Sequence, residues 1–575
     1  MRLMQMHTCS PLAPMLALSL IASASPASAT ESSHAGAVQG PAVTGYVFLD
    51  ENRNGALDRG ERGVRNVPVS NGREVAQTDG RGRYVLPAYD EMVVFVTKPA
   101  GFATPLNENN VPQFFYVHSA SGSPSRIVQY PGLGPTGPLP AQVNFPLYKT
   151  RNPQKFRAII AGDMQPYNDT EISYLRDSFV SEVAAEEGEF VIALGDNVGD
   201  NLSLYPRLLS VLSQIGRPIH LVPGNHDRNY DSPDDAHSYD SYKRLYGPDY
   251  YSFDYGDVHF VVLNSVEHYL NAQGRGAYYG GIDEKQMAWL ANDLALVPED
   301  RLVLLNMHIP ITGFGNTTVG YGNIPALYDL LKGRKVLSLA AHTHTTEYYL
   351  PGEEKPAGMP TPFTQLIAGA SCGAWWSGDF DETGVPVSYQ SDGAVRGYYK
   401  FDFKGNAYTE SFKATGKPAS RQMNLSFLTS SFTSWYDQIV NWMSTPAASR
   451  PPAPPVTYKD LPDQGTLPVA ELSTVKLVAN VWNGSSASRV TCAFDDSAPQ
   501  NGEQRMDLGD PYANRLQGYY FKTGLPGSRH VKSSRHLWTC TVPADLAPGS
   551  HRVTVSEQDM FGQIHNETKA FEVAP

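Results

Sequence analysis

The sequence predicts an α/β domain that lies between two β-rich domains. The chain has 575 residues, which exceeds the ~250–300 residues at which a single hydrophobic core usually stops growing. From Lys155 onward, short apolar strands alternate with amphipathic helical segments, a pattern typical of an α/β layer. On both sides of this region, strand-like runs are separated by turn residues, and the chain contains 50 glycines and 44 prolines.

Residues 1–29 have the pattern of a secretory signal peptide. Arg2 precedes an apolar stretch at residues 11–24, and an Ala-Ser-Ala triplet at residues 27–29 supplies a cleavage site. The apolar stretch is shorter than the ~20 residues that a membrane span needs. No later segment has the pattern of a span. We therefore expect an exported protein, periplasmic or extracellular, without a transmembrane helix.

The first domain is expected at residues 40–149, as a β-sandwich-like module. Residues 43–49 and 82–86 are strand-like, with turn residues between them. A stretch rich in proline and glycine, residues 131–140, follows near the end of this region.

Within this module, residues 50–61 fit the twelve-residue pattern of a calcium-binding loop. Side-chain oxygens fall at five of the ligand positions, one position offers a backbone carbonyl, and Gly55 stands at the sharp turn. The candidate calcium ligands are Asp50, Asn52, Asn54, Ala56, Asp58 and Glu61. The alternative is a solvated turn rich in Asn and Gly, and in both cases we expect the loop to act in structure and not in catalysis.

The α/β domain is expected at residues 150–365, and side chains that suit metal binding follow its apolar strands. The strands are predicted at 157–162, 190–195, 219–223, 302–307 and 336–341. The side chains that follow them are Asp163 and Gln165, then Asp196, then Asn225, His226 and Asp227, then His308, and finally His342 and His344. The carboxyl ends of strands in an open α/β sheet form the edge where ligands bind.

These side chains indicate a dinuclear metal centre. Oxygen ligands combined with neutral imidazoles suit Mn²⁺, Fe²⁺ or Zn²⁺. Two such ions ~3.5–4 Å apart, bridged by a carboxylate, would bind a phosphate and activate water. Each residue alone is more often part of a turn or of packing, but five such strand ends in succession favour a shared site.

The pattern resembles that of the calcineurin-like metallophosphoesterase superfamily, over about residues 155–350. The resemblance implies a four-layer α/β/β/α sandwich around two metal ions. It implies that one ion is bound by Asp163, Gln165, Asp196 and His344, and the other by Asp196, Asn225, His308 and His342. Asp196 would bridge the ions. His226 would lie beside the substrate as general acid, or would stabilise the charge on the leaving oxygen.

The sequence departs from the common family pattern at two positions. Gln165 stands where a histidine is usual, and an amide oxygen is a weaker ligand. Some exported and nucleotide-cleaving relatives share this form, so we do not interpret it as an inactive site. Ala341 replaces the glycine before His342, a change that is tolerable where the backbone angle is ordinary.

The third domain is expected at residues 366–575, as a β domain. Together with the first domain it resembles the layout of exported bacterial members of the superfamily, which carry N- and C-terminal β domains. Trp375 and Trp376 are candidate substrate contacts that would stack on a sugar, a base or another flat group. The alternative is that they pack the junction between two domains.

The cysteines of the mature chain are expected to form one pair and one single thiol. Cys492 and Cys540 both lie in strand-like runs and would pair in an oxidising compartment. Cys372 remains, and we interpret it as a small buried residue near the metal site.

These observations predict an exported hydrolase that cleaves a phosphodiester or phosphomonoester of a small molecule or glycoconjugate. The formal net charge of −13 argues against nucleic-acid polymers as partners, since proteins that bind them cluster Lys and Arg. Two alternatives stay open. One is a nucleotide pyrophosphatase or cyclic-nucleotide phosphodiesterase. The other is an exported binding protein, not an enzyme, whose metal site serves structure alone.

Overall fold

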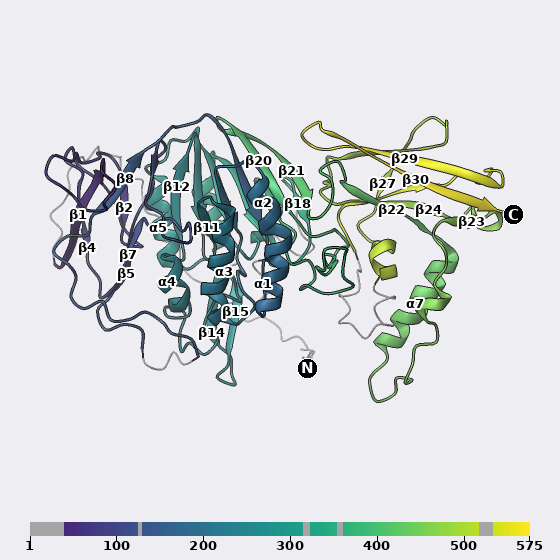
Figure 1. The fold of residues 1–575 in the computed structure, drawn as a ribbon, viewed down its shortest axis with the longest axis horizontal. Helices are drawn as coiled ribbons and strands as arrows, with labels where there is room; N and C mark the ends of the chain where they lie inside the picture. Colours follow the sequence, from purple (N-terminus) through teal and green to yellow (C-terminus); the bar gives the residue numbers. More distant parts are fainter. Residues whose placement is uncertain (1–39, 125–128, 314–322, 354–359, 517–532) are drawn as a thin grey trace, which may run out of the picture. The chain divides into compact units, whose positions relative to one another are not determined.

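A computed structural model describes residues 40–124, 129–313, 323–353, 360–516 and 533–575 (Figure 1). The predicted signal peptide, residues 1–29, lies outside these ranges. Among the described residues, no helix is long and apolar enough to cross a membrane.

The N-terminal β module consists of two four-stranded sheets. Their strand orders are β4-β1-β8-β6 and β3-β2-β5-β7. The strands are β1 (Ala42–Leu49), β2 (Pro68–Ser70), β3 (Val75–Gln77), β4 (Arg83–Pro87), β5 (Glu91–Val96), β6 (Phe102–Ala103), β7 (Phe115–Ser119) and β8 (Phe145–Lys149). Val47 of β1, Val69 of β2 and Val94 of β5 belong to one buried cluster, so the two sheets share a core.

The predicted calcium loop follows β1 directly. Asp50 is buried and accepts hydrogen bonds from the backbone of Asn54 and Gly55, at 3.3 and 2.8 Å. Asp58 accepts from the side-chain amides of Asn52 and Asn54, both at 2.8 Å. These bonds lie within the loop, and calcium binding stays a prediction.

The central domain contains two mixed sheets, each with a parallel core of three or more strands. One has the order β11-β10-β9-β20-β21 and the other β12-β13-β16-β17-β19-β18. The first is built from β9 (Lys155–Ala161), β10 (Phe190–Ala193), β11 (Ile219–Leu221), β20 (Gly397–Lys404) and β21 (Ala407–Ala414). The second is built from β12 (Tyr251–Tyr255), β13 (Val258–Val262), β16 (Leu302–Asn306), β17 (Lys335–Ala340), β18 (Glu347–Tyr349) and β19 (Thr364–Ile367).

The two sheets pack against each other through aromatic side chains. The rings of Phe190 in β10 and Phe260 in β13 are 5.3 Å apart, and those of Phe156 in β9 and Phe260 are 6.3 Å apart. Every residue of β10 and β16 is buried, as expected for strands covered on both faces. The five predicted strands are confirmed, although they divide between two sheets.

Helices accompany both sheets of the central domain. They are α1 (Asp169–Leu175), α2 (Ser181–Ala185), α3 (Tyr205–Leu212), α4 (Asp240–Tyr246), α5 (Glu284–Leu294) and α6 (Ile324–Leu331), and a π-helix, η1 (Arg176–Val180), joins α1 to α2. A hairpin of β14 (Val266–Leu270) and β15 (Gly276–Gly280) completes the domain. Asp283 caps the N-terminus of α5, since its side chain accepts from the backbone of Gln286 at 2.6 Å.

Two strands that follow the expected boundary between residues 365 and 366 pair with the first sheet of the central domain. β20 pairs antiparallel with β9. β21 pairs with β20, and the two strands lie side by side in Figure 1. Residues 397–414 therefore complete the first sheet of the central domain although they follow that boundary.

The C-terminal β domain consists of two sheets and one long helix, α7 (Ser430–Ser444). The sheets have the orders β22-β24-β28-β27 and β23-β30-β29-β25-β26. Their strands are β22 (Met423–Leu428), β23 (Thr466–Pro468), β24 (Lys476–Val481), β25 (Arg489–Phe494), β26 (Gln500–Asn501), β27 (Glu503–Gln504), β28 (Leu537–Thr541), β29 (Gly549–Gln558) and β30 (Ile564–Ala574). The predicted disulfide between Cys492 in β25 and Cys540 in β28 is present and links the two sheets.

Candidate metal centre

Both sheets of the central domain deliver side chains to one site. Asp163, Asp196 and Asn225 follow β9, β10 and β11, whereas His308 and His342 follow β16 and β17. These strands run parallel within their sheets, so their carboxyl ends meet at a common edge.

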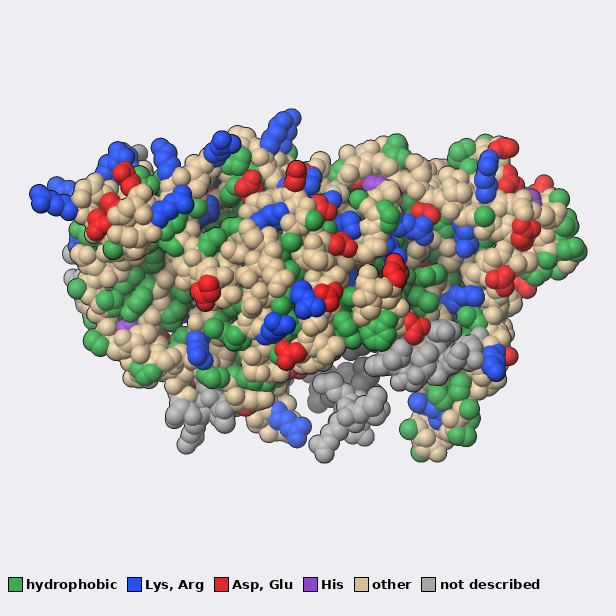
Figure 2. All heavy atoms as spheres, viewed as in Figure 1, with side chains coloured by type: hydrophobic (Ala, Val, Ile, Leu, Met, Phe, Trp, Pro, Cys, Tyr) green, Lys and Arg blue, Asp and Glu red, His purple; other side chains and the backbone are tan. Residues whose placement is uncertain are grey.

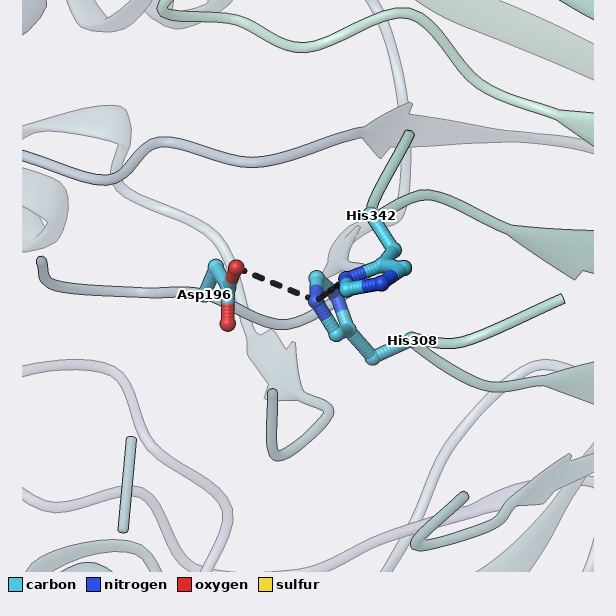
Figure 3. A group of neighbouring side chains, drawn as sticks. All are labelled: Asp196, His308 and His342. Carbon is cyan, nitrogen blue, oxygen red and sulfur yellow. Dashed lines mark hydrogen bonds and ion pairs between the residues drawn. The ribbon is translucent and has the colours of Figure 1, made fainter. Parts of the chain in front are cut away.

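Asp196, His308 and His342 form the centre of the site (Figure 3). His308 Nε2 lies 3.1 Å from Asp196 Oδ2 and 3.2 Å from His342 Nδ1. The same nitrogen is 3.1 Å from Asn225 Oδ1. One ligand atom from each of Asp196, His308 and His342 lies within 4.8 Å of the others, a spacing that a single metal ion would bridge.

Asp163 and His344 extend the site on its other side. His344 Nε2 lies 3.6 Å from Asp163 Oδ1, and His308 Nε2 lies 4.0 Å from the same oxygen. Asp163 is fully buried, and its Oδ1 has no hydrogen-bond partner among the described residues. Because an unsatisfied buried carboxylate oxygen is costly, this atom fits a role as a metal ligand.

Gln165 lies beside the site but makes few short contacts with it. Its backbone donates to the carbonyl of Asp196 at 2.9 Å. Its side-chain nitrogen is 3.4 Å from the Tyr167 hydroxyl, and its Oε1 is 3.9 Å from Cys372 Sγ. The amide oxygen is thus not held by a strong donor and remains suited to a cation.

Backbone carbonyls fix the orientation of two histidine rings. His308 Nδ1 donates to Leu194 O at 2.8 Å, and His344 Nδ1 donates to Gly373 O at 2.6 Å. In both rings Nε2 is therefore the nitrogen that faces the carboxylates. Metal-binding histidines show this same arrangement, with the second nitrogen donating to a carbonyl or carboxylate.

The carboxylates create a field that favours positive charge. Burial disfavours the charged form of His308, but Asp196 and Asp163 outweigh this effect and raise its pKa to about 9. Burial and the neighbouring His308 lower the pKa of His342 to about 3. Burial alone would raise the pKa of Asp196, yet His308 and His226 hold it below the usual range. A field of this sign also suits a divalent cation.

His226 is paired with Asp200, a carboxylate that is not among the predicted site residues. His226 Nδ1 lies 2.6 Å from Asp200 Oδ1, and its Nε2 lies 3.9 Å from Asp196 Oδ2. The His226 side chain keeps 22% of its surface exposed, so solvent reaches it. Burial opposes its charged form, but Asp196 and Asp200 raise its pKa to about 9. Asp200 lies in the same loop after β10 as Asp196, but only the structure places it beside His226.

Asp227 connects two loops of the site and is not one of the predicted metal ligands. The carboxylate is fully buried and accepts from the backbone of Asn197 at 3.1 Å, from the backbone of Gly224 at 2.8 Å and from the Tyr205 hydroxyl at 3.1 Å. It therefore ties the loop after β10 to the loop after β11.

Trp375 and Trp376 have different surroundings. Trp375 stacks on the ring of His344, with centroids 4.5 Å apart. Trp376 is buried, donates from its indole nitrogen to Met164 O at 2.9 Å and has Arg396 over its ring. These contacts favour a packing role for Trp376, and its role as a substrate contact stays a prediction. Trp375 lies beside the site.

Cys372 and Ala341 have surroundings that agree with their interpretation from the sequence. Cys372 is a free, buried cysteine whose Sγ lies 3.8 Å from His344 Nδ1, as expected for a small residue near the site. The backbone of Ala341 does not adopt the left-handed conformation, so its methyl group is tolerated where glycine is usual.

Comparisons with known proteins agree with this geometry. Three family models match the chain. They describe the N-terminal part of calcineurin-like phosphoesterases over residues 51–129, the calcineurin-like phosphoesterase itself over 156–346, and its C-terminal part over 365–565. No curated protein matches the chain.

Two solved structures are similar at low identity. A purple acid phosphatase from yellow lupin (Lupinus luteus) seeds is 13% identical, with 63% of this chain and 76% of that chain covered and a TM-score of 0.34. A dimetal phosphatase from Danio rerio is 17% identical, with 44% and 98% covered and a TM-score of 0.29. These scores are too low to bear on the substrate. The family models cover all three regions of the chain, which belongs to the calcineurin-like phosphoesterases, hydrolases with a dinuclear metal centre.

Proposed function

We propose that this protein is an exported phosphoesterase that hydrolyses a phosphodiester or phosphomonoester with metal-activated water. The observation that carries the proposal is the buried Asp163 Oδ1, which has no hydrogen-bond partner among the described residues. It faces His344 on one side of a group in which Asp196, His308 and His342 converge. A site built in this way satisfies its carboxylates through cations.

The residues present fit two divalent ions of the Mn, Fe or Zn class. The proposed ligands of the first ion are Asp163, Gln165, Asp196 and His344. Those of the second are Asp196, Asn225, His308 and His342. When bound, such ions neutralise phosphoryl oxygens and lower the pKa of water. Every proposed ligand offers an oxygen or a ring nitrogen, which suits these metals.

His226 is proposed as the general acid that protonates the leaving oxygen. Its Nδ1 hydrogen bonds to Asp200 at 2.6 Å, which fixes the ring and leaves Nε2 as the nitrogen that would hand over a proton. The backbone nitrogen of His226 donates to Asp196 Oδ1 at 2.8 Å, so the ring is held next to the central carboxylate. Asp200 acts through His226 and is a positioning residue.

The substrate is proposed to be a small extracytoplasmic phosphoester or a glycoconjugate. On the face shown in Figure 2, basic and acidic side chains are interspersed. This distribution, together with a net charge of −13, supports contact with phosphate through metal ions more than through a basic surface. The stacking of Trp375 on His344 favours a second candidate, a nucleotide phosphodiesterase or pyrophosphatase, because a base would stack on an aromatic ring near the metals.

Hydrolysis of nitrophenyl phosphates tests the proposal. The purified chain is assayed with Mn²⁺ on bis-nitrophenyl and mononitrophenyl phosphate, and a nucleotide panel is run in parallel. His226→Ala is expected to lose at least about 100-fold in kcat, the lower end of what a general acid contributes. His237→Ala is the matched control, since His237 also pairs with an aspartate, Asp234, at 2.7 Å but lies outside the site. Native rates in His226→Ala would refute the assigned role.

A further inference from the structure

The loop that carries His342 and His344 adopts an unfavourable backbone conformation. His342 has φ 74° and His344 has φ 53°, both in the left-handed region that residues other than glycine rarely adopt. Such conformations persist where surrounding contacts determine them. The contacts that hold this loop therefore bear directly on the positions of two proposed metal ligands.

A turn at residues 390–394 makes two of these contacts. The backbone nitrogen of Ser391 donates to the carbonyl of His344 at 2.7 Å. The backbone nitrogen of Thr346 donates to Asp392 Oδ2 at 2.6 Å. The turn thus holds the loop on both sides of residue 345.

Asp392 is in turn held by the C-terminal domain. His536, which lies just before β28, is fully buried, and its Nε2 is 2.9 Å from the Asp392 oxygen that accepts from Thr346. Gly393, next to Asp392, is packed so closely that an added Cβ would lie 2.7 Å from Asp510 Cβ. The turn therefore lies directly against the third domain.

Both ring nitrogens of His536 have polar partners in the buried interior. Asn480 donates from Nδ2 to Asp510 at 2.9 Å, so its Oδ1 is the atom that faces His536 Nδ1 at 2.7 Å. The other ring nitrogen faces the carboxylate of Asp392. His536 and Asp392 thus form a buried hydrogen-bonded pair, and removing one partner would leave a buried polar group unsatisfied.

We propose that His536 of the C-terminal domain is a positioning residue of the metal centre, acting through Asp392 on the loop that carries His342 and His344. This inference rests on the proposed metal ligands. It gives the C-terminal domain a part in metal binding, because the described contacts run from β24 and the segment before β28 to the backbone beside His344.

Metal affinity tests this proposal. The full-length protein is stripped of metal with a chelator and titrated with Mn²⁺, and free Mn²⁺ is followed by electron paramagnetic resonance. Outer-shell partners typically change metal affinity ~10–100-fold, so we expect His536→Ala to bind Mn²⁺ about tenfold more weakly. His536→Gln retains an N–H that would donate to Asp392 and is expected to recover most of the affinity, a rescue that a merely structural role would not produce.

His551→Ala is the matched control. His551 lies in the same domain and pairs with Asp495 at 2.7 Å, without contact with the loop. It is expected to bind Mn²⁺ as the native chain does. Native affinity in a folded His536→Ala variant would overturn the proposal. Should His536→Ala not fold, Asp392→Asn replaces it, and native affinity there would overturn the proposal equally. A native chain that binds no Mn²⁺ would refute the metal centre itself.

Discussion

Reduction of the Cys492–Cys540 disulfide should destabilise the C-terminal domain by about 4 kcal/mol. The bond joins residues separated by 48 positions. In the loop-entropy model, cross-linking a loop of this length removes ~13–14 cal/mol/K from the unfolded chain, which is about 4 kcal/mol at 25 °C. For a domain of ~150–250 residues, each kcal/mol shifts the melting temperature by ~2–4 °C. We therefore expect a decrease of about 8–16 °C.

Differential scanning calorimetry with and without reductant measures this shift. The double variant Cys492→Ala/Cys540→Ala should melt near the reduced native chain and should not respond to reductant, which separates the disulfide from the buried thiol of Cys372. A shift below about 2 °C on reduction would refute the entropic reasoning. Because such bonds persist in oxidising compartments, finding this pair oxidised in freshly isolated protein would also support export.

Three further predictions concern other parts of the chain. His259 lies between Asp254 and Asp293, at 2.8 Å from each, and although burial opposes its charge, these carboxylates raise its pKa to about 9. The stability from this raised pKa is complete below the unfolded value of ~6.5 and is lost as pH rises through about 9. The melting temperature should therefore fall over that range, and less so in His259→Gln. If residues 50–61 bind calcium, Ca²⁺ at ~100 times its Kd should stabilise the chain by ~2.7 kcal/mol, measured by melting with Ca²⁺ or a chelator. Trp375→Ala should raise KM for aromatic phosphoesters about tenfold, with a smaller effect on non-aromatic ones, if the ring stacks on substrate.

The apolar strands and the side chains after them were predictable because both are local features. A run such as residues 302–305 is apolar throughout, which predicts a strand buried on both faces. The partner of each strand was not predictable in this way. Strands buried on both faces have no alternation to tell one sheet from another, and β20 joins β9 from a distant part of the sequence.

The contacts that support the site could not be predicted from the local sequence either. Asp200 is recognisable as functional only once the ring of His226 is placed beside it. Asp392 and His536 lie in different domains, and no motif spacing connects them. The contacts of such residues can be seen only in the tertiary structure. The proposed metal ligands, in contrast, follow the strands in a recurring order along the chain.

Several proposed metal ligands have strained backbone conformations, and the supporting contacts compensate for this strain. Gln165, Asp196, His342 and His344 all have φ between 38° and 74°, although local preference would place glycine or asparagine in such conformations. Each costs about 1–3 kcal/mol unless its surroundings compensate. A functional site often breaks local sequence rules in this way and is stabilised elsewhere. Here the compensation for His344 includes the bond from Ser391, and through Asp392 it extends into the C-terminal domain. The candidate ligands could therefore be proposed from the sequence, whereas the interactions that hold them in place required the structure.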